Sequence, residues 1–286
     1  MRNKIFILSQ DLSFFYKLNK ELLRLNVQFE ILNVNSKIPT IPCIILTTSE
    51  EMVNFRSGNK VIFLPYSKND NFEEYLLKVV AGYRIGYKDY YSDLLFSIDP
   101  GEKSGLMVFL DGYYLISHCC YKKSDLLYKI TRYVFYFQKD NPELINLSFK
   151  FGRGILKMVQ DLVKDVFNLF PDRKNMSVLL IDEYKSSQIK INNKDKERRI
   201  TKDEVAALIL ALKNGVEVNL SNYSIIFNQI KSKKFKKEDL KFDIIKNTQA
   251  EPQFLSEVAE KILSGELSLK ESINRINEKL LNVQKI

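Results

Sequence analysis

The chain is poor in the residues that most often carry nucleophilic catalysis or bind zinc. Among its 286 residues there are no tryptophans, one histidine and three cysteines. Because His118 is the only histidine, a Ser-His-Asp or Cys-His arrangement would have to use it, yet it lies in YYLISHCCY, a predicted strand. Cys43, Cys119 and Cys120 lack the paired spacing of a zinc site, and three unpatterned cysteines fit a reducing cytoplasm.

Long apolar runs and phosphate-binding glycine motifs are absent as well. No run approaches the roughly 20 apolar residues of a membrane-spanning helix. The start, MRNKIFILSQD, becomes polar too soon for a signal peptide. No glycine pattern of a dinucleotide-binding site or a P-loop occurs. We therefore expect a cytoplasmic protein with no membrane partner.

Positive charge, by contrast, is in excess. The chain carries 44 Lys and Arg against 35 Asp and Glu, a formal net charge of +9. This excess favours a polyanionic partner such as nucleic acid. One basic segment contains seven of the cations: Lys185, Lys190, Lys194, Lys196, Arg198, Arg199 and Lys202. The alternative for this segment is a solvated loop.

The stretch LLFSIDPGEKSGLMVFLDG, residues 94–112, predicts a β-hairpin. An apolar run ends in Asp99 before Pro100-Gly101, and a second run, 106–110, ends in Asp111-Gly112. The first strand is apolar at nearly every position, so we expect it to be central and buried. An ionised carboxylate at the end of a buried strand is costly unless it is paired or binds a metal. Asp99 is therefore either a turn residue or part of a site.

Two further acidic positions lie at the ends of predicted elements. The run 178–181 predicts a buried strand that ends in Asp182-Glu183. In ITKDEVAALILALKNG, Thr201 predicts a helix N-cap, with Glu204 three residues later as in a capping box. Asp203 and Glu204 fall in the first turn, where the helix dipole alone would favour them.

A strand-end Asp, a strand-end Glu and a helix-start Asp can meet at one edge of a sheet and hold divalent ions. Mg²⁺ takes hard oxygen ligands and keeps several waters, so two or three carboxylates suffice. Two ions about 4 Å apart can activate a water and stabilise the leaving oxygen in phosphodiester hydrolysis. The residues alone thus select Asp99, Glu183 and Asp203, with Glu204 as a further metal ligand and Mg²⁺ or Mn²⁺ as cofactor.

Four motifs together resemble a known superfamily. Asp99-Pro-Gly with Gly105 resembles the first-strand motif of RNase H-fold nucleases of the RuvC Holliday-junction resolvase type. FGRG at 151–154, DEYKSS at 182–187 and DEVAA at 203–207 resemble the GDG, DE-x-x-T-T and D-[DE]-x-A-A segments of the YqgF-like branch. The motifs occur in family order over roughly residues 92–215. The resemblance implies catalytic, metal-binding roles for the same three carboxylates.

Two departures from the family pattern concern the site. Arg153 replaces the acidic residue of GDG, and Ser186-Ser187 replace the threonine pair. Arg153 would either contact a scissile phosphate or mark a site that no longer cuts. The residues expected to contact nucleic acid are Arg153, Lys185, Ser186, Lys196, Arg198, Arg199 and Lys202.

The pattern along the chain predicts an α/β protein of three parts. Strands alternate with helices over residues 1–90, which indicates a mostly parallel α/β domain for scaffolding, partner binding or nucleic-acid positioning. Residues 91–215 follow the order βββαβαβα of an RNase H-like mixed-sheet domain.

The third part, residues 216–286, has a weaker pattern. It begins with a strand-like stretch over 216–227, followed by a basic linker. Two short amphipathic helices are predicted at 252–263 and 269–281. This helical extension either packs on the body of the protein or mediates homodimerisation.

Three functions remain open on the sequence. The first is a metal-dependent nuclease for structured DNA or RNA, including branched junctions, and the carboxylates and basic segment favour it. The second is a nucleic-acid-binding, repair- or replication-associated protein that lacks efficient cleavage, which Arg153 and the N-terminal domain favour. The third is an ASKHA-type phosphotransferase, which shares the fold core. Against it, the chain lacks a duplicated half and Gly-rich phosphate loops.

Overall fold

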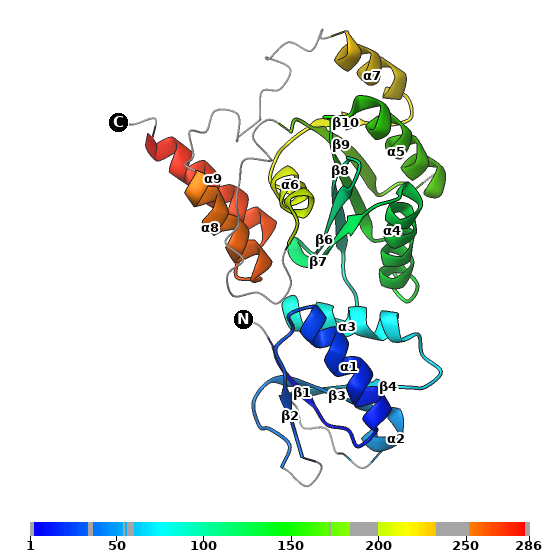
Figure 1. Ribbon diagram of the computed structural model, residues 1–286, viewed down its shortest axis with the longest axis vertical. Coiled ribbons are helices and arrows are strands. Elements are labelled where there is room, and N and C mark those ends of the chain that lie inside the picture. Colours follow the sequence, from blue (N-terminus) through cyan, green and yellow to red (C-terminus); the bar gives the residue numbers. More distant parts are fainter. Residues whose placement is uncertain are drawn as a thin grey trace. The chain divides into compact units, whose positions relative to one another are not determined.

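The described part of the chain falls into two compact units (Figure 1). The computed structural model describes residues 3–33, 37–53, 55, 60–171, 173–183, 200–232 and 252–283. The first unit comprises the described residues up to Asp89, and the second begins at Tyr90. The described residues of the predicted C-terminal extension belong to the second unit.

A four-stranded parallel sheet forms the centre of the first unit. Its strand order is β2-β1-β3-β4. The strands are β1 (Lys4–Ile7), β2 (Glu30–Ile31), β3 (Cys43–Thr48) and β4 (Val61–Tyr66). The helices are α1 (Leu12–Arg24), α2 (Ser49–Met52) and α3 (Phe72–Arg84). The predicted parallel α/β fold of this unit is confirmed.

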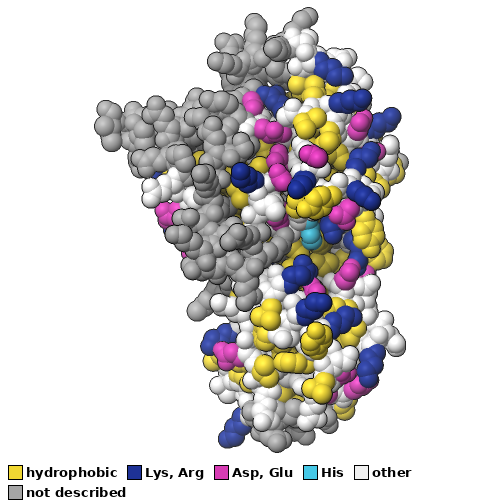
Figure 2. Space-filling model, viewed as in Figure 1, with side chains coloured by type: hydrophobic (Ala, Val, Ile, Leu, Met, Phe, Trp, Pro, Cys, Tyr) yellow, Lys and Arg dark blue, Asp and Glu magenta, His cyan; other side chains and the backbone are white. Residues whose placement is uncertain are grey.

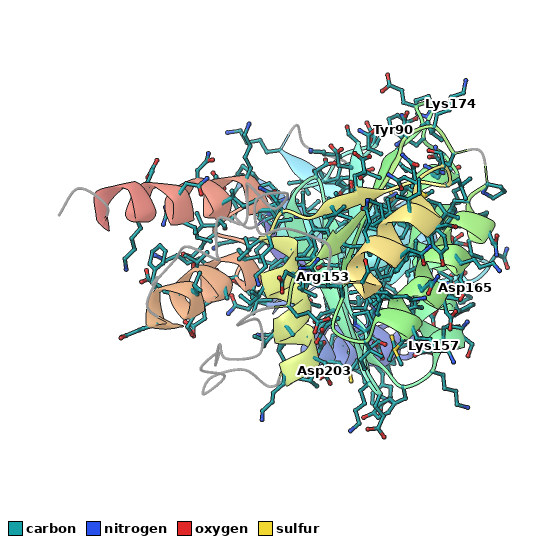
Figure 3. The ribbon with its side chains drawn as sticks, turned by 90° about the horizontal axis from the view of Figure 1, so that it is seen from above. Tyr90, Arg153, Lys157, Asp165, Lys174 and Asp203 are labelled. Carbon is teal, nitrogen blue, oxygen red and sulfur yellow. The ribbon has the colours of Figure 1, made fainter. Side chains whose placement is uncertain are left out.

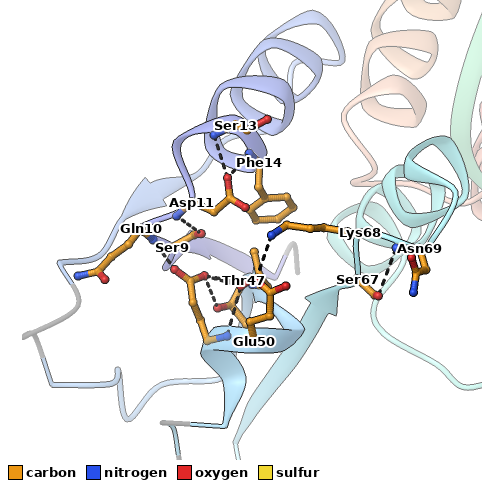
Figure 4. Close-up of polar contacts among 12 residues, drawn as sticks. Ser9, Gln10, Asp11, Ser13, Phe14, Thr47, Glu50, Ser67, Lys68 and Asn69 are labelled. Atoms are coloured by element: carbon orange, nitrogen blue, oxygen red, sulfur yellow. Dashed lines mark hydrogen bonds and ion pairs between the residues drawn. The ribbon is translucent and has the colours of Figure 1, made fainter.

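At the carboxyl ends of β1 and β3, the carboxylate of Glu51 fills the position where such sheets usually bind ligands. It accepts hydrogen bonds from the Gln10 N–H, the Thr47 hydroxyl and both the N–H and hydroxyl of Thr48 (Figure 4). Despite burial, these bonds hold the pKa of Glu51 below its usual value. Asp11 instead caps α1. These polar groups at the carboxyl ends of β1 and β3 therefore already form hydrogen bonds within the protein.

A six-stranded mixed sheet forms the centre of the second unit. Its strand order is β10-β9-β8-β5-β6-β7. The strands are β5 (Asp93–Asp99), β6 (Ser104–Leu110), β7 (Tyr113–Cys120), β8 (Asn146–Gly152), β9 (Met176–Ile181) and β10 (Val216–Val218). β5, β6 and β7 are antiparallel, whereas β5, β8 and β9 are parallel. This is the predicted RNase H-like arrangement, with the predicted hairpin at its centre.

Helices cover both faces of this sheet. They are α4 (Lys123–Gln138), α5 (Leu156–Leu169), α6 (Lys202–Ala211), α7 (Tyr223–Lys231), α8 (Pro252–Leu263) and α9 (Leu269–Val283). Figure 1 shows α4 and α5 on one face and α6 on the other, with α8 and α9 outside α6. Leu255 and Val258 of α8 share a hydrophobic cluster with Leu208 and Leu212. The C-terminal helices thus pack on the body of the second unit.

Helix α6 is fixed to the sheet by side chains from two strands. The Ser97 hydroxyl on β5 donates to the Ala207 carbonyl at 2.7 Å. The Lys150 ammonium on β8 donates to the carbonyls of Ala211 and Lys213, which would otherwise lack partners at the helix end. Burial lowers the pKa of Lys150 to about 8. These bonds set the position of α6 and hence of its first turn.

The stretch 216–227 differs from its prediction as a strand. Only Val216–Val218 forms a strand, and α7 begins at Tyr223. Between them the side-chain oxygens of Asn219 and Asn222 each accept the backbone N–H of the other residue, at 2.9 and 2.8 Å. Such Asn-backbone bonds favour a turn. The strand prediction was therefore wrong beyond Val218.

By length and hydropathy, none of the helices in the described part of the chain could cross a bilayer.

Candidate active site

Asp99 ends the central strand β5, between two glycines on the neighbouring strands. On one side it pairs with Gly105 of β6. On the other side Ile98 pairs with Phe151 of β8, so Gly152 follows beside Asp99. Neighbouring strands lie about 4.8 Å apart. Asp99 is therefore flanked at close range by two positions without side chains.

Gly105 receives the start of α6. A Cβ atom at Gly105 would lie 2.0 Å from the carbonyl oxygen of Asp203 and 2.8 Å from the nitrogen of Glu204. No real side chain fits at these distances, so only glycine permits this contact. The backbone of Asp203 thus rests on the strand that pairs with Asp99.

Gly152 and Gly154 receive the carboxylate of Glu183. A Cβ at Gly152 would lie 2.4 Å from Glu183 Oε1, and one at Gly154 would lie 2.1 Å from Oε2. The Gly154 N–H donates to Oε1 at 2.6 Å. Gly152, at the end of β8, and Gly154, just after it, therefore form a cradle that holds the Glu183 carboxylate next to Asp99.

Asp203 and Glu204, adjacent in the first turn of α6, have different roles. The Thr201 N–H donates to Glu204 Oε2 at 2.8 Å, and the Glu204 N–H donates to the Thr201 hydroxyl at 3.2 Å. The predicted capping box is confirmed. Glu204 is only 1% exposed. The Cys119 thiol donates to Asp203 Oδ2 at 3.9 Å. The Glu204 carboxylate therefore holds the helix cap, and Asp203 lies at the sheet edge.

The three predicted site carboxylates interact electrostatically. Burial, together with the nearby charges of Glu183 and Asp203, raises the pKa of Asp99 to about 7. Like charges disfavour ionisation in this way at short range. In the described ranges, no three His, Cys, Asp or Glu side chains are arranged around a common metal position. The donor set, three carboxylates, is nevertheless of the kind that Mg²⁺ and Mn²⁺ prefer.

Arg153 is held by an ion pair within the protein. Its guanidinium lies 2.8 Å from the Asp182 carboxylate, and both side chains are partly buried. Lys213, only 1% exposed, donates its ammonium to the Asp182 carbonyl at 2.9 Å. Figure 3 shows Arg153 and Asp203 on the side of the unit where α6 lies. Two cations thus fix the segment that leads to Glu183.

Most of the predicted basic segment lies outside the described part of the chain. Lys185, Ser186, Lys196, Arg198 and Arg199 lie outside the described residues. Lys202 is exposed at the start of α6, one residue before Asp203. Figure 2 shows acidic side chains gathered on one face of the second unit, with Lys and Arg side chains around them.

A groove at the same end of the sheet as Asp99 was not predicted from the sequence. It has a volume of about 450 Å³ and lies between the loop after Asp99, the β7–α4 junction and the start of α5. Tyr121, Lys122 and Lys157 are among its lining residues. An aromatic residue followed by two lysines, at the end of the predicted strand 113–121, was the available signal.

The chain matches no protein-family model, and it matches no curated protein. Among solved structures it is similar to "Crystal structure of Aa-Ago with externally-bound siRNA", with 12% sequence identity and a TM-score of 0.23. The match covers 82% of this chain but 49% of that one, so this chain spans about half its length. At so low a TM-score the similarity carries no argument about fold or function.

Proposed function

We propose that the second unit binds nucleic acid and hydrolyses its phosphodiester backbone with divalent cations held by Asp99, Glu183 and Asp203. The supporting observation is their convergence. Asp99 lies between Gly105 and Gly152, and the other two acidic residues lie on these glycines. Like charges gathered at a partly buried edge are costly unless a cation balances them. The RuvC- and YqgF-like motifs select the same three residues and favour a structured or branched substrate.

The carboxylate oxygens of these three residues would hold Mg²⁺ or Mn²⁺. Such an ion acts as a Lewis acid on a phosphoryl oxygen and lowers the pKa of a bound water. The Gly154 N–H fixes the orientation of the Glu183 carboxylate. The capping box of Thr201 and Glu204 fixes the first turn of α6 and therefore Asp203. A cation would also favour the ionised form of Asp99, whose pKa is otherwise raised to about 7.

The decisive experiment compares cleavage by Asp99→Asn and the wild type. A labelled four-way DNA junction and a single strand are incubated with Mg²⁺ or Mn²⁺. We expect Asp99→Asn to abolish cleavage, because Asn keeps the size but removes a charged ligand. Asp93→Asn, at the opposite end of the same strand, is the control and should cut normally. Cleavage by Asp99→Asn at the wild-type rate would exclude Asp99 as a ligand.

A second function, nucleic-acid binding without cleavage, is favoured by two observations. Arg153, in the position of an acidic family residue, is paired with Asp182 next to Glu183. The described residues also contain no ready-made metal cluster. Titration calorimetry with Mn²⁺ separates the two functions. Absence of Mn²⁺ binding, together with nucleic-acid affinity that is unchanged by EDTA, would support this second function and contradict the first.

Both functions require a basic surface for the phosphate backbone. We propose that the segment from Lys185 to Lys202 supplies it. Replacing Lys196, Arg198 and Arg199 with Ser should weaken binding to all sequences. The slope of log K against log salt should fall by up to about 0.9 for each duplex phosphate that the variant no longer neutralises. An unchanged affinity and slope would make this segment a solvated loop.

A further inference from the structure

The groove lined by Tyr121 has the size of a substrate subsite and lies at the end of the sheet where Asp99 lies. Gly101, two residues after Asp99, lines one wall. Ile155 lines another and directly follows Gly154, whose N–H holds Glu183. The volume of about 450 Å³ lies within the range of small-ligand sites. A substrate group in this groove would therefore lie at the same end of the sheet as the three carboxylates.

The rim of the groove presents apolar side chains to water. Tyr121 is 68% exposed and Ile155 is 48% exposed. The Lys103 ammonium lies 5.2 Å from the centroid of the Tyr121 ring. Tyr121 directly follows strand β7, so its backbone is attached to the rigid sheet. An exposed aromatic ring with a nearby cation is a typical platform for stacking nucleobases.

The charges in the groove are nearly balanced. Lys122 and Lys157 are exposed and form no ion pair with any described residue. Figure 3 shows Lys157 on the side of the unit where α5 lies. Glu102 and Asp161 line the same groove, and the Lys123 ammonium is paired with Asp165 at 2.8 Å. Such a mixed lining favours a neutral, planar group over a phosphate.

We infer that this groove binds one unpaired nucleobase, stacked on Tyr121, beside the phosphate at the carboxylate site. The inference rests on the proposed function and specifies its substrate class. The substrate is DNA or RNA with an unpaired nucleotide next to the scissile bond, not a continuous duplex. Lys122 and Lys157 contact the flanking phosphates.

The test measures binding by fluorescence anisotropy in EDTA, so that no cleavage occurs. The probes are a labelled DNA single strand, an abasic strand of the same length and a perfect duplex. Tyr121→Ala should bind the single strand about tenfold more weakly, with no change for the abasic strand or the duplex. Tyr121→Phe should bind like the wild type. Equal thermal melting of all variants confirms folding.

Tyr128→Ala is the matched control. Tyr128 is 58% exposed, carries the Arg132 guanidinium 5.7 Å from its ring centroid and does not line the groove. Its replacement should leave all three affinities unchanged. Lys122→Ser with Lys157→Ser should weaken binding of both single strands. The salt slope should then fall by about 0.7 for each phosphate that these lysines neutralise in the wild type.

The outcomes separate this inference from the proposed function. If Tyr121→Ala binds the single strand like the wild type, or loses as much affinity for the abasic strand, the inference is wrong. Cleavage of DNA by the wild type would then still support the proposed function. If Tyr121→Ala shows the base-dependent loss but the wild type neither binds Mn²⁺ nor cuts, the inference stands and the cleavage proposal fails.

Discussion

The Glu183 carboxylate occupies the space that a side chain at position 154 would need, since Oε2 lies 2.1 Å from a Cβ built on Gly154. In the same way, the backbone of Asp203 occupies the space that a side chain at position 105 would need. Each of these two acidic residues is therefore in direct contact with a glycine, Glu183 with Gly154 after β8 and Asp203 with Gly105 of β6. Glycine is required here by close approach, not by unusual backbone angles.

Gly154→Ala should displace the Glu183 carboxylate and weaken Mn²⁺ binding. Overpacking of this kind costs about 1–3 kcal/mol, which urea denaturation measures. In a Glu183→Ala background the same substitution should cost much less, because the atoms that it strikes are gone. An equal cost in both backgrounds would show that the two residues do not compete for this space.

The raised pKa of Asp99 predicts a pH-dependent stability of the metal-free protein. Its folded-state pKa of about 7 lies above the ordinary value of 3.8. The resulting stabilisation is fully present below about pH 4 and is lost as the pH rises through 7. In EDTA, Asp99→Asn should therefore gain stability over the wild type between pH 4 and pH 8, as followed by urea denaturation. A stability difference that is the same at all pH values, or that Asp93→Asn reproduces, would contradict the assignment.

The ion pair of Arg153 and Asp182 predicts energetic coupling. Arg153→Gln and Asp182→Asn should each destabilise the protein, and the double variant should lose less than the sum. We expect a coupling of about 1–3 kcal/mol, in the range of hydrogen bonds to charged groups. A coupling near zero, combined with a loss of nucleic-acid affinity in Arg153→Gln, would instead indicate that Arg153 contacts phosphate.

Asp203 and Glu204 should respond differently to loss of charge. Glu204→Gln keeps a capping-box residue and should cost at most about 1 kcal/mol of stability, with Mn²⁺ affinity unchanged. Asp203→Asn should lower Mn²⁺ affinity with little effect on folding. Calorimetric titration of both variants with Mn²⁺ shows which of the two carboxylates binds the ion. Loss of Mn²⁺ affinity in Glu204→Gln would instead support Glu204 as a further metal ligand.

Turns, strands and helix caps that depend on neighbouring residues in the sequence could be predicted from local patterns. The hairpin around Asp99 follows from two apolar runs with a turn signal, and the cap at Thr201 follows from a spacing of three residues. The pairing of Arg153 with Asp182 joins segments 29 residues apart, and no local pattern encodes it. The apolar residues of the stretch 216–227 favour a strand, but the side chains of Asn219 and Asn222 bond the backbone and form a turn that ends it.

The groove at Tyr121 is a further feature that local sequence patterns do not encode. Its walls come from three segments that are distant in the sequence, so its existence depends on tertiary packing. The same applies to the cradle of Glu183, although its glycines were recognised as part of a motif. Sequence patterns therefore selected the acidic residues as candidates, whereas tertiary packing is what holds the Glu204 carboxylate in the helix cap and Glu183 against its two glycines.

Helix α6 has no polar face: every residue from Glu204 to Ala211 is buried, between the sheet and the helix α8 that packs on it. A helix of this kind cannot fold at a water interface. Helix α6, which carries Asp203 at its start, thus depends on the helices α8 and α9, which begin some 40 residues later in the chain. A protein truncated before Pro252 would expose Leu208 and Leu212 and would be prone to aggregate. Loss of activity in this truncated protein would then result from a folding defect. It would not show that α8 and α9 bind the substrate.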